Sequence, residues 1–287
     1  MEKCFITKLN GIVSSPDILK LGEMRINVTK LDNPTSKTQY FSFTFNEKSD
    51  IEIIGDGYFT NENLSVNYGK KKTVEPNTDT IIYVSNGDFG LSIFDKYSLK
   101  NIVVFTLGYS ISNKKMSDIE VLKFSKNLTN LNLPNTQVSG DIGGLKTLTA
   151  LTSLSLYNTQ VPHTGNIGEL SALSKCTEIL IKYSKLSGDL ATLPSVCRFV
   201  SFDRDKGSVF TWSERPSSAK ILAIQGTANL TNVDKMLQDQ AQCQVGFSAS
   251  DASWYKTIFI TGTRTSASDA AVQTLQSKGY TVSITPA

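Results

Sequence analysis

Two nearly identical runs of apolar and polar residues follow each other in the middle of the chain. The first reads LTNLNLPNTQVSGDIGGLKTL from Leu128, and after two residues the second reads LTSLSLYNTQVPHTGNIGELSAL up to Leu173. Equivalent early positions are 151 − 128 = 23 residues apart, and later ones are 167 − 142 = 25 apart, because the second run has two extra residues near His163. A pattern that repeats at this period predicts a stack of similar structural units.

Leu131 and Leu133 are two residues apart, so on a β-strand their side chains point to the same side. Asn130 and Asn132 then point to the opposite side. The later Ile142, Leu145 and Leu148 would close a coil around the same interior. Because one such coil cannot bury its apolar side alone, we expect several coils to stack and share one continuous core.

The L-x-x-L-x-L spacing of these runs resembles the leucine-rich repeat family. The VSGDI segment from Val138 resembles the plant-type subclass of that family, which adds a second short strand after the first turn. Thr136 and Thr159 stand where the family usually has Asn. The resemblance implies a solenoid with a parallel sheet, of the α/β or mostly β class, and a non-enzymatic role in binding other proteins.

Weaker copies extend the pattern in both directions and predict about seven coils over residues 98–287. Val103 and Phe105 are expected to take the places of Leu131 and Leu133 in a first coil. Helices are expected at 232–242 and 266–278, on the back side of the last coils. The apolar pairs that mark the coils after Leu173 are Ile179 and Ile181, Val200 and Phe202, Leu222 and Ile224, Ile258 and Ile260, and Val282 and Ile284.

Residues 1–97 carry no leucine repeat. Phe41, Phe43 and Phe45 alternate with polar residues, and similar short alternations are separated by Asp, Asn, Pro and Gly. Such spacing predicts a small all-β domain. A solenoid needs its first apolar coil covered, so we expect this domain to cap it.

The chain of 287 residues has 29 basic and 26 acidic residues, a net charge of +3. This balance gives no reason to expect a nucleic-acid partner. No apolar stretch is long enough for a transmembrane segment, and the first residues lack the apolar core of a signal peptide. The sequence leaves open an extracellular, virion-surface or cytoplasmic location.

Residues that could carry catalysis or bind a metal are scarce. His163 is the only histidine, so a His-based metal cluster is excluded, and we expect this side chain on an exposed loop. Cys176 and Cys197 occupy equivalent repeat positions and read as buried core residues, with a disulfide as the alternative. Asp141 and Asp189 supply too few oxygen ligands for calcium. We therefore expect no enzyme activity, no cofactor and no metal.

The outward positions of the strands are the candidate binding surface, because the core does not require them. Taking Ile221 and Ala223 as outward positions in the fifth coil, an apolar patch centres on Leu180, Phe199 and Phe259. A one-residue shift in register would make these residues core instead. The full set of predicted partner-binding residues is Tyr157, Leu180, Lys182, Phe199, Asp203 and Phe259.

A protein is the expected partner of this surface, and a homodimer contact is an alternative. A cell-surface or phage-tail-like adhesin is a second interpretation. A carbohydrate-binding module, using exposed aromatic residues such as Tyr157 or Trp212, is a third. A hydrolase with its site in residues 1–97 is a fourth, although no motif there supports it.

Overall fold

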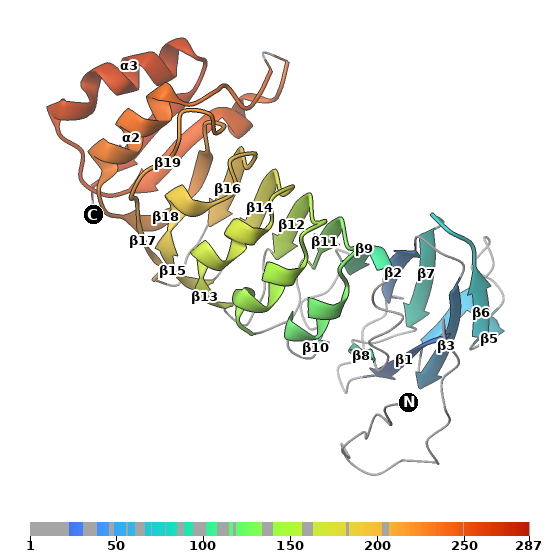
Figure 1. The fold of residues 1–287 in the computed structure, drawn as a ribbon. Helices are drawn as coiled ribbons and strands as arrows, with labels where there is room; N and C mark the ends of the chain where they lie inside the picture. Colours follow the sequence, from blue (N-terminus) through green and yellow to red (C-terminus); the bar gives the residue numbers. More distant parts are fainter. Residues whose placement is uncertain are drawn as a thin grey trace.

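The chain forms a curved stack of coils with two β-sheets at its N-terminal end and two helices at its C-terminal end (Figure 1). The computed structural model describes residues 23–30, 39–45, 49–55, 57–60, 67–69, 71–77, 79–84, 89–93, 102–107, 115–116, 119–133, 140–156, 163–181, 184–202, 207–248 and 250–286.

Seven parallel strands of the solenoid lie side by side and line its concave face. Their inward residues are in register from Leu131 through Leu154, Ile179, Val200, Ile224 and Ile258 to Val282. The first six of these are at most 1% exposed, and each fully buried aliphatic side chain contributes about 1.5–3 kcal/mol. The strands are β11 (Asn130–Asn132), β12 (Ser153–Leu156), β14 (Glu178–Ile181), β16 (Phe199–Phe202), β18 (Ala223–Leu230), β19 (Thr257–Thr261) and β20 (Thr281–Thr285).

A second set of short parallel strands follows the first turn of the middle coils, as the plant-type resemblance implied. It contains β13 (Thr164–Asn166), β15 (Lys185–Asp189) and β17 (Val209–Thr211). β18 joins both sets, because its beginning pairs with β16 and its end pairs with β17. The register of β18 with β19 shifts between Gln225 and Asn229, where the strand passes from one set to the other.

The 3₁₀ helices on the back side of the middle coils begin at a repeated side-chain cap. Asp141, Asn166 and Asp189 each accept a hydrogen bond from the backbone N–H two residues later, at 2.7–2.9 Å. Gly165 and Gly188 have φ near +121° and +112°, and an added Cβ would lie within 2.3 Å of the cap oxygen of the preceding coil. Glycine at these positions therefore lets successive coils stack closely. The helices are η2 (Ile142–Thr147), η3 (Ile167–Ala172) and η4 (Leu190–Thr192), preceded by η1 (Ile119–Phe124).

True α-helices replace these short turns in the last coils, and they confirm both predicted helices. α2 spans Val233–Gln242 and α3 spans Asp269–Ser277, with η6 (Ser266–Ser268) directly before α3. Their apolar residues Met236, Leu237 and Leu275 are fully buried. η5 (Ser253–Lys256) lies just before β19. None of the described helices is long and apolar enough to span a membrane.

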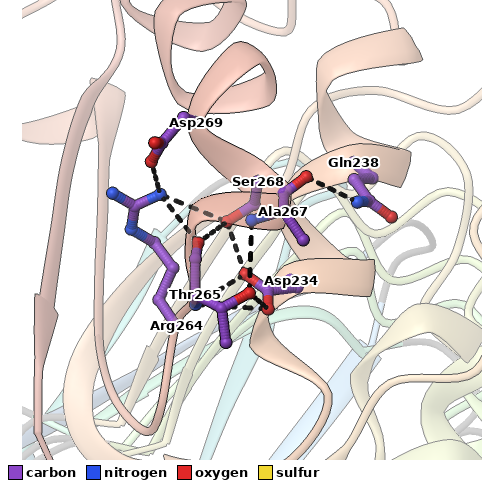
Figure 2. Close-up of polar contacts among 7 residues, drawn as sticks. All are labelled: Asp234, Gln238, Arg264, Thr265, Ala267, Ser268 and Asp269. Atoms are coloured by element: carbon purple, nitrogen blue, oxygen red, sulfur yellow. Dashed lines mark hydrogen bonds and ion pairs between the residues drawn. The ribbon is translucent and has the colours of Figure 1, made fainter.

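A network of polar groups fixes α2 against the start of α3 (Figure 2). The Asp234 carboxylate accepts hydrogen bonds from the Thr265 backbone N–H and hydroxyl, and from the Ser268 hydroxyl at 2.5 Å. The bond from Ser268 is the largest cause that lowers the pKa of Asp234. Arg264 donates to Asp269 at 2.6 Å, and Gln238 donates to the Ala267 carbonyl at 3.0 Å.

The N-terminal part is β-rich, as its alternation predicts. A five-stranded sheet has the order β10-β8-β1-β3-β6, and the remaining strands continue the concave sheet in the order β9-β2-β7-β4-β5. These strands are β1 (Glu23–Lys30), β2 (Gln39–Phe45), β3 (Ser49–Gly55), β4 (Gly57–Thr60), β5 (Asn67–Gly69), β6 (Lys71–Val74), β7 (Asp79–Val84), β8 (Phe89–Ile93), β9 (Ile102–Leu107) and β10 (Lys115–Met116).

β9 is the strand at which the two parts of the chain meet. It pairs in parallel with β11 on one side and antiparallel with β2 on the other. Phe105 lies opposite Leu131, so it takes the place of Leu131 rather than that of Leu133, and the expected positions of Val103 and Phe105 are wrong by two residues. The boundary between residues 97 and 98 stays a prediction.

Candidate binding surface on the concave sheet

Two columns of outward side chains run across the concave sheet. In both columns the first two coils carry small polar residues, whereas the later coils also carry larger or apolar residues such as Glu178, Leu180, Phe199 and Phe259. The first column is Asn130, Ser153, Glu178, Phe199 and Ala223. The second column is Asn132, Ser155, Leu180, Ser201, Gln225, Phe259 and Ser283.

The fifth coil departs from the predicted register by two residues. Phe199 lies opposite Ala223 and Ser201 lies opposite Gln225, whereas the sequence pattern placed Ile221 and Ala223 at these outward positions. Ile221 precedes the strand and is fully buried. Because a shift of two residues keeps each side chain on the same face, Ile224 still points inward, but it lies opposite Val200 rather than Phe202.

Phe199 is only 1% exposed, so the expectation that it forms part of an exposed patch is wrong. The ring of Tyr255 meets the Phe199 ring edge-on, with centroids 5.2 Å apart. Phe247 stacks on Tyr255 at 5.4 Å. Both rings belong to the segment between α2 and β19, which therefore covers the concave side of β16.

Arg198 attaches this covering segment to the sheet. Its guanidinium lies 4.6 Å from the centroid of the Phe247 ring. Its Nη2 donates to Glu178 Oε1 at 2.9 Å, and its Nη1 donates to the Gly246 carbonyl at 3.5 Å. The backbone N–H of Gly246 in turn donates to the Tyr280 hydroxyl at 3.2 Å. The cation–π contact and the ion pair hold the aromatic residues in one position.

A tight turn stiffens the outer part of the same segment. Asp251 accepts from the Ser248 backbone N–H at 2.6 Å and from the Ser248 hydroxyl at 3.0 Å. These bonds, the backbone one first, lower the pKa of Asp251. Lys256 donates to the Ser248 carbonyl at 3.1 Å. The described residues 244–248 and 250–256 thus form a fixed ridge, which we call the aromatic ridge.

The structure brings two of the predicted binding residues, Leu180 and Phe259, into one column beside the aromatic ridge. Both side chains are half-buried. Tyr157, Lys182 and Asp203 lie outside the described residues. Sequence reasoning missed Arg198 and Phe247, because no local pattern shows that a segment so distant in the chain folds over β16.

Trp212 and His163, which we expected on the surface, are both buried. Trp212 is 1% exposed, and its indole Nε1 donates to Asp239 at 2.9 Å, so it cannot serve as a carbohydrate platform. His163 is fully buried rather than exposed on a loop. Its carbonyl accepts from the Lys185 backbone N–H at 2.8 Å, which ties the inserted residues into the next coil.

The described cysteines lie in the core. Cys176, Cys197 and Cys243 are free, buried thiols, so the disulfide alternative for Cys176 and Cys197 is wrong. Burial raises the pKa of Cys176 and Cys197 to about 12, so neither thiol is ionised at neutral pH. Among the described residues no group of three or more His, Cys, Asp or Glu could hold a metal ion.

Arg215 is a buried cation that holds two coils together. It is 3% exposed and donates to the carbonyls of Leu193, Pro194 and Cys197 at 3.0–3.2 Å. Burial lowers its pKa. Because these carbonyls belong to the turn before β16, the guanidinium fixes the entry into this strand, which Arg198 precedes and Phe199 begins.

No family model matches the chain, and no curated protein matches it. The ectodomain of the plant receptor kinase GASSHO1/SCHENGEN3 from Arabidopsis thaliana, solved in complex with CASPARIAN STRIP INTEGRITY FACTOR 2, is similar over 61% of this chain, with 20% identity and a TM-score of 0.38. This chain spans 20% of that one.

A second similar structure is the ectodomain of the receptor kinase SOBIR1, also from Arabidopsis thaliana. It matches 49% of this chain and 73% of its own, with 19% identity and a TM-score of 0.28. Both solved structures are leucine-rich repeat ectodomains. The parallel register, the shared leucine core and the helical back side make the fold of this chain a leucine-rich repeat solenoid of the α/β class.

Proposed function

We propose that this chain is a non-enzymatic binding protein that recognises a protein partner on the concave sheet, beside the aromatic ridge. The observation that carries this proposal is the pair of half-buried apolar residues Leu180 and Phe259, which lie in one column with half-buried Gln225 and with Ser201, whose side chain is only 2% exposed. Asn132 and Ser155 hold the same column in the earlier coils, so a coil of this fold does not require apolar residues there.

The setting of this column favours a rigid, preformed site. On one side stands the aromatic ridge, held by Arg198 through Phe247 and Glu178. Beneath the column lies the buried row of Ile179, Val200 and Ile224. A surface whose side chains are already fixed loses little conformational entropy on binding. Half-buried aromatic and aliphatic residues bordered by polar groups are typical anchors of protein interfaces.

The chemistry of the same surface argues against catalysis. Glu178 on β14 and Arg198 just before β16 form an ion pair with each other. The pKa of Tyr255 is raised, mainly by burial, so its phenol stays protonated at neutral pH. The surface offers shape, apolar area and hydrogen-bonding groups, which serve recognition rather than bond breaking.

Two substitutions on the column test the proposal. The purified protein is applied to a protein array and to a glycan array, together with the double variant Leu180→Ser, Phe259→Ser. The control is Val196→Ser, Val209→Ser, which removes apolar surface at two exposed positions outside the column. We expect a protein ligand that binds the wild type and the control at least about tenfold more tightly than the double variant, a loss of about 1.4 kcal/mol.

Two results would contradict the proposal. Equal binding by the double variant would show that the partner does not contact this column. Binding to glycans alone would replace the protein partner by a carbohydrate. Circular dichroism of each variant checks that the fold is retained.

A further inference from the structure

The concave sheet carries almost no charge. Nine adjacent strands of the described sheet contain a single charged residue, Glu178, although charged residues make up 19% of the whole chain. These strands are β2, β9, β11, β12, β14, β16, β18, β19 and β20. Inward positions are apolar in any solenoid, so the outward positions are the informative ones. Outward residues with hydroxyl or amide groups are Asn130, Asn132, Ser153, Ser155, Ser201, Gln225, Thr257 and Thr261.

Charged side chains lie instead on the helical side of the same coils. η1, η2, η3 and α2 each contain charged residues, and these helices are on the side of the coils away from the concave strands (Figure 1). Lys146 on η2 pairs with Glu169 on η3 at 2.9 Å, and Lys235 pairs with Asp239 at 2.7 Å. The surface of this protein therefore accepts charges, and their scarcity is a property of the concave sheet.

The charges closest to the concave strands are bound within the protein itself. Arg198, directly before β16, donates to Glu178 at 2.9 Å. The aromatic ridge carries one acid and one base, Asp251 and Lys256, and both are hydrogen-bonded to Ser248. The ion pair and the aromatic ridge thus each have a net charge of zero.

We infer, building on the proposed function, that the protein partner presents an uncharged surface of hydroxyl, amide and apolar groups to the concave sheet. A charge on the partner would lose its hydration there without gaining an opposite charge, which is unfavourable. Neutral polar groups, in contrast, find hydroxyl and amide groups in the outward columns. Leaving the charges of a wrong partner unpaired is a common source of specificity, so this sheet selects neutral partners.

The two apolar positions of the column set the spacing of the partner's apolar groups. Leu180 on β14 and Phe259 on β19 are three strand steps apart, through β16 and β18. At about 4.8 Å per step this separation is about 14 Å along the sheet. Gln225 lies between them and is half-buried. The partner is therefore expected to bring apolar side chains to the two ends and a neutral polar group to Gln225.

Three peptide libraries test this inference with the full chain. Each displays random peptides of about twelve residues on phage, which span about 40 Å when extended. All contain the same share of leucine, phenylalanine and tyrosine. The polar residues of the first library are serine, threonine, asparagine and glutamine, and some of these are replaced by lysine and arginine in the second and by aspartate and glutamate in the third.

Selection on the wild type is followed by subtraction on the double variant Leu180→Ser, Phe259→Ser. The subtraction removes peptides that bind elsewhere, such as acidic peptides on the lysines of the helical side. We expect the neutral library alone to yield peptides that bind the wild type at least about tenfold more tightly than the double variant.

A charge placed between the two apolar positions gives an independent readout. The variants are Gln225→Glu, which has nearly the same shape as the wild type, and Gln225→Lys. Both should weaken the selected neutral peptides by at least about threefold, because either charge would be buried without a partner. The control Lys175→Glu, on an exposed turn outside the columns, should leave the affinity unchanged. Wild-type affinity should change by less than about twofold between about 0.1 M and about 1 M salt, since no charge is screened.

The outcomes separate this inference from the proposed function. Column-dependent peptides from the acidic or basic library, opposite effects of the two Gln225 variants, or a strong salt dependence would each show a charged partner, while the column would remain the site. If no library yields peptides that distinguish the wild type from the double variant, the site itself is wrong and this inference falls with it. Circular dichroism and thermal melting of each variant check that the fold is retained.

Discussion

The Arg198 guanidinium lies 4.6 Å from the centroid of the Phe247 ring, 49 residues later in the chain (247 − 198 = 49). The same side chain binds Glu178 on the neighbouring strand at 2.9 Å. One cation therefore connects two strands of the sheet with the aromatic ridge that covers them.

Replacing Arg198 by Met keeps the apolar stem but removes the cation. We expect a loss of about 0.5–2 kcal/mol, from a cation–π contact of about 0.5–1 kcal/mol and a partly buried ion pair of up to about 1 kcal/mol. Faster amide exchange across residues 244–256 should accompany it. Lys146→Met, which removes the exposed pair with Glu169, serves as control and should cost less than about 0.5 kcal/mol. Equal losses in the two variants would contradict the assigned role of Arg198.

Phe199 and Phe259 should respond very differently to truncation. Phe199→Ala should destabilise the protein by about 3–5 kcal/mol, because the buried ring leaves a cavity between Tyr255 and the sheet. Phe259→Ala should cost less than half as much, since its ring is half-buried. Urea unfolding measures both. A Phe199→Ala variant as stable as the wild type would show that the aromatic ridge does not cover this ring.

The interior of the second clear coil provides the simplest test of the solenoid core. Leu154 is fully buried in register with Leu131 and Ile179, so Leu154→Ala should cost about 2–5 kcal/mol. Ser155→Ala, on the opposite side of the same strand, should change stability by less than about 0.5 kcal/mol. If denaturant titration finds similar midpoints for the two variants, Leu154 does not lie in a shared core.

The contact between α2 and α3 should weaken in acid. Hydrogen bonds from Ser268 and Thr265 lower the folded-state pKa of Asp234 below its ordinary value of 3.8. The carboxylate therefore stabilises the fold above pH 3.8, and this contribution falls as the pH drops from 3.8 toward the folded-state pKa. Asp251, whose pKa is also lowered, adds to the slope. Asp234→Asn should be less stable at neutral pH and should show a shallower loss in acid, measured by urea unfolding at several pH values. An unchanged slope would show that Asp234 does not contribute.

Removal of residues 1–97 should damage the solenoid. β2 pairs with β9 through Phe43 and Phe105, and Phe43 and Phe45 are fully buried. A chain beginning at residue 98 would expose β9 as an edge strand, so we expect self-association and a lower melting temperature. A monomer with an unchanged melting temperature would instead show that the N-terminal sheets and the solenoid are independent.

The early coils could be predicted from sequence because two clear copies fix their register. Leu131 and Leu154 are flanked by polar residues, so only one alternation fits. In the fifth coil Ile221, Leu222, Ala223 and Ile224 are all apolar, and alternation alone cannot choose between registers. The register is fixed by the pairing of Ala223 with Phe199 and of Ile224 with Val200. Such pairing between strands cannot be read from a local sequence pattern.

The candidate site was harder to predict than the fold. Alternation indicates which side of a strand Phe199 occupies, but not which distant segment covers that side. The aromatic ridge contains no leucine repeat, so nothing in the sequence around Phe247 indicated that this segment covers β16. His163 was misjudged for a similar reason, because an insertion in a repeat was expected to lie on the surface, whereas this one is buried against the next coil.

β18 belongs to both strand sets, and this affects how the solenoid comes apart. A force applied to the C-terminal end would first separate β20 and then β19, each held by a single strand ladder. To detach β18, its backbone hydrogen bonds to β16 and those to β17 must break together. We expect a pulling experiment with optical tweezers to record a pause at this strand, with the last two coils unfolded and the first coils intact.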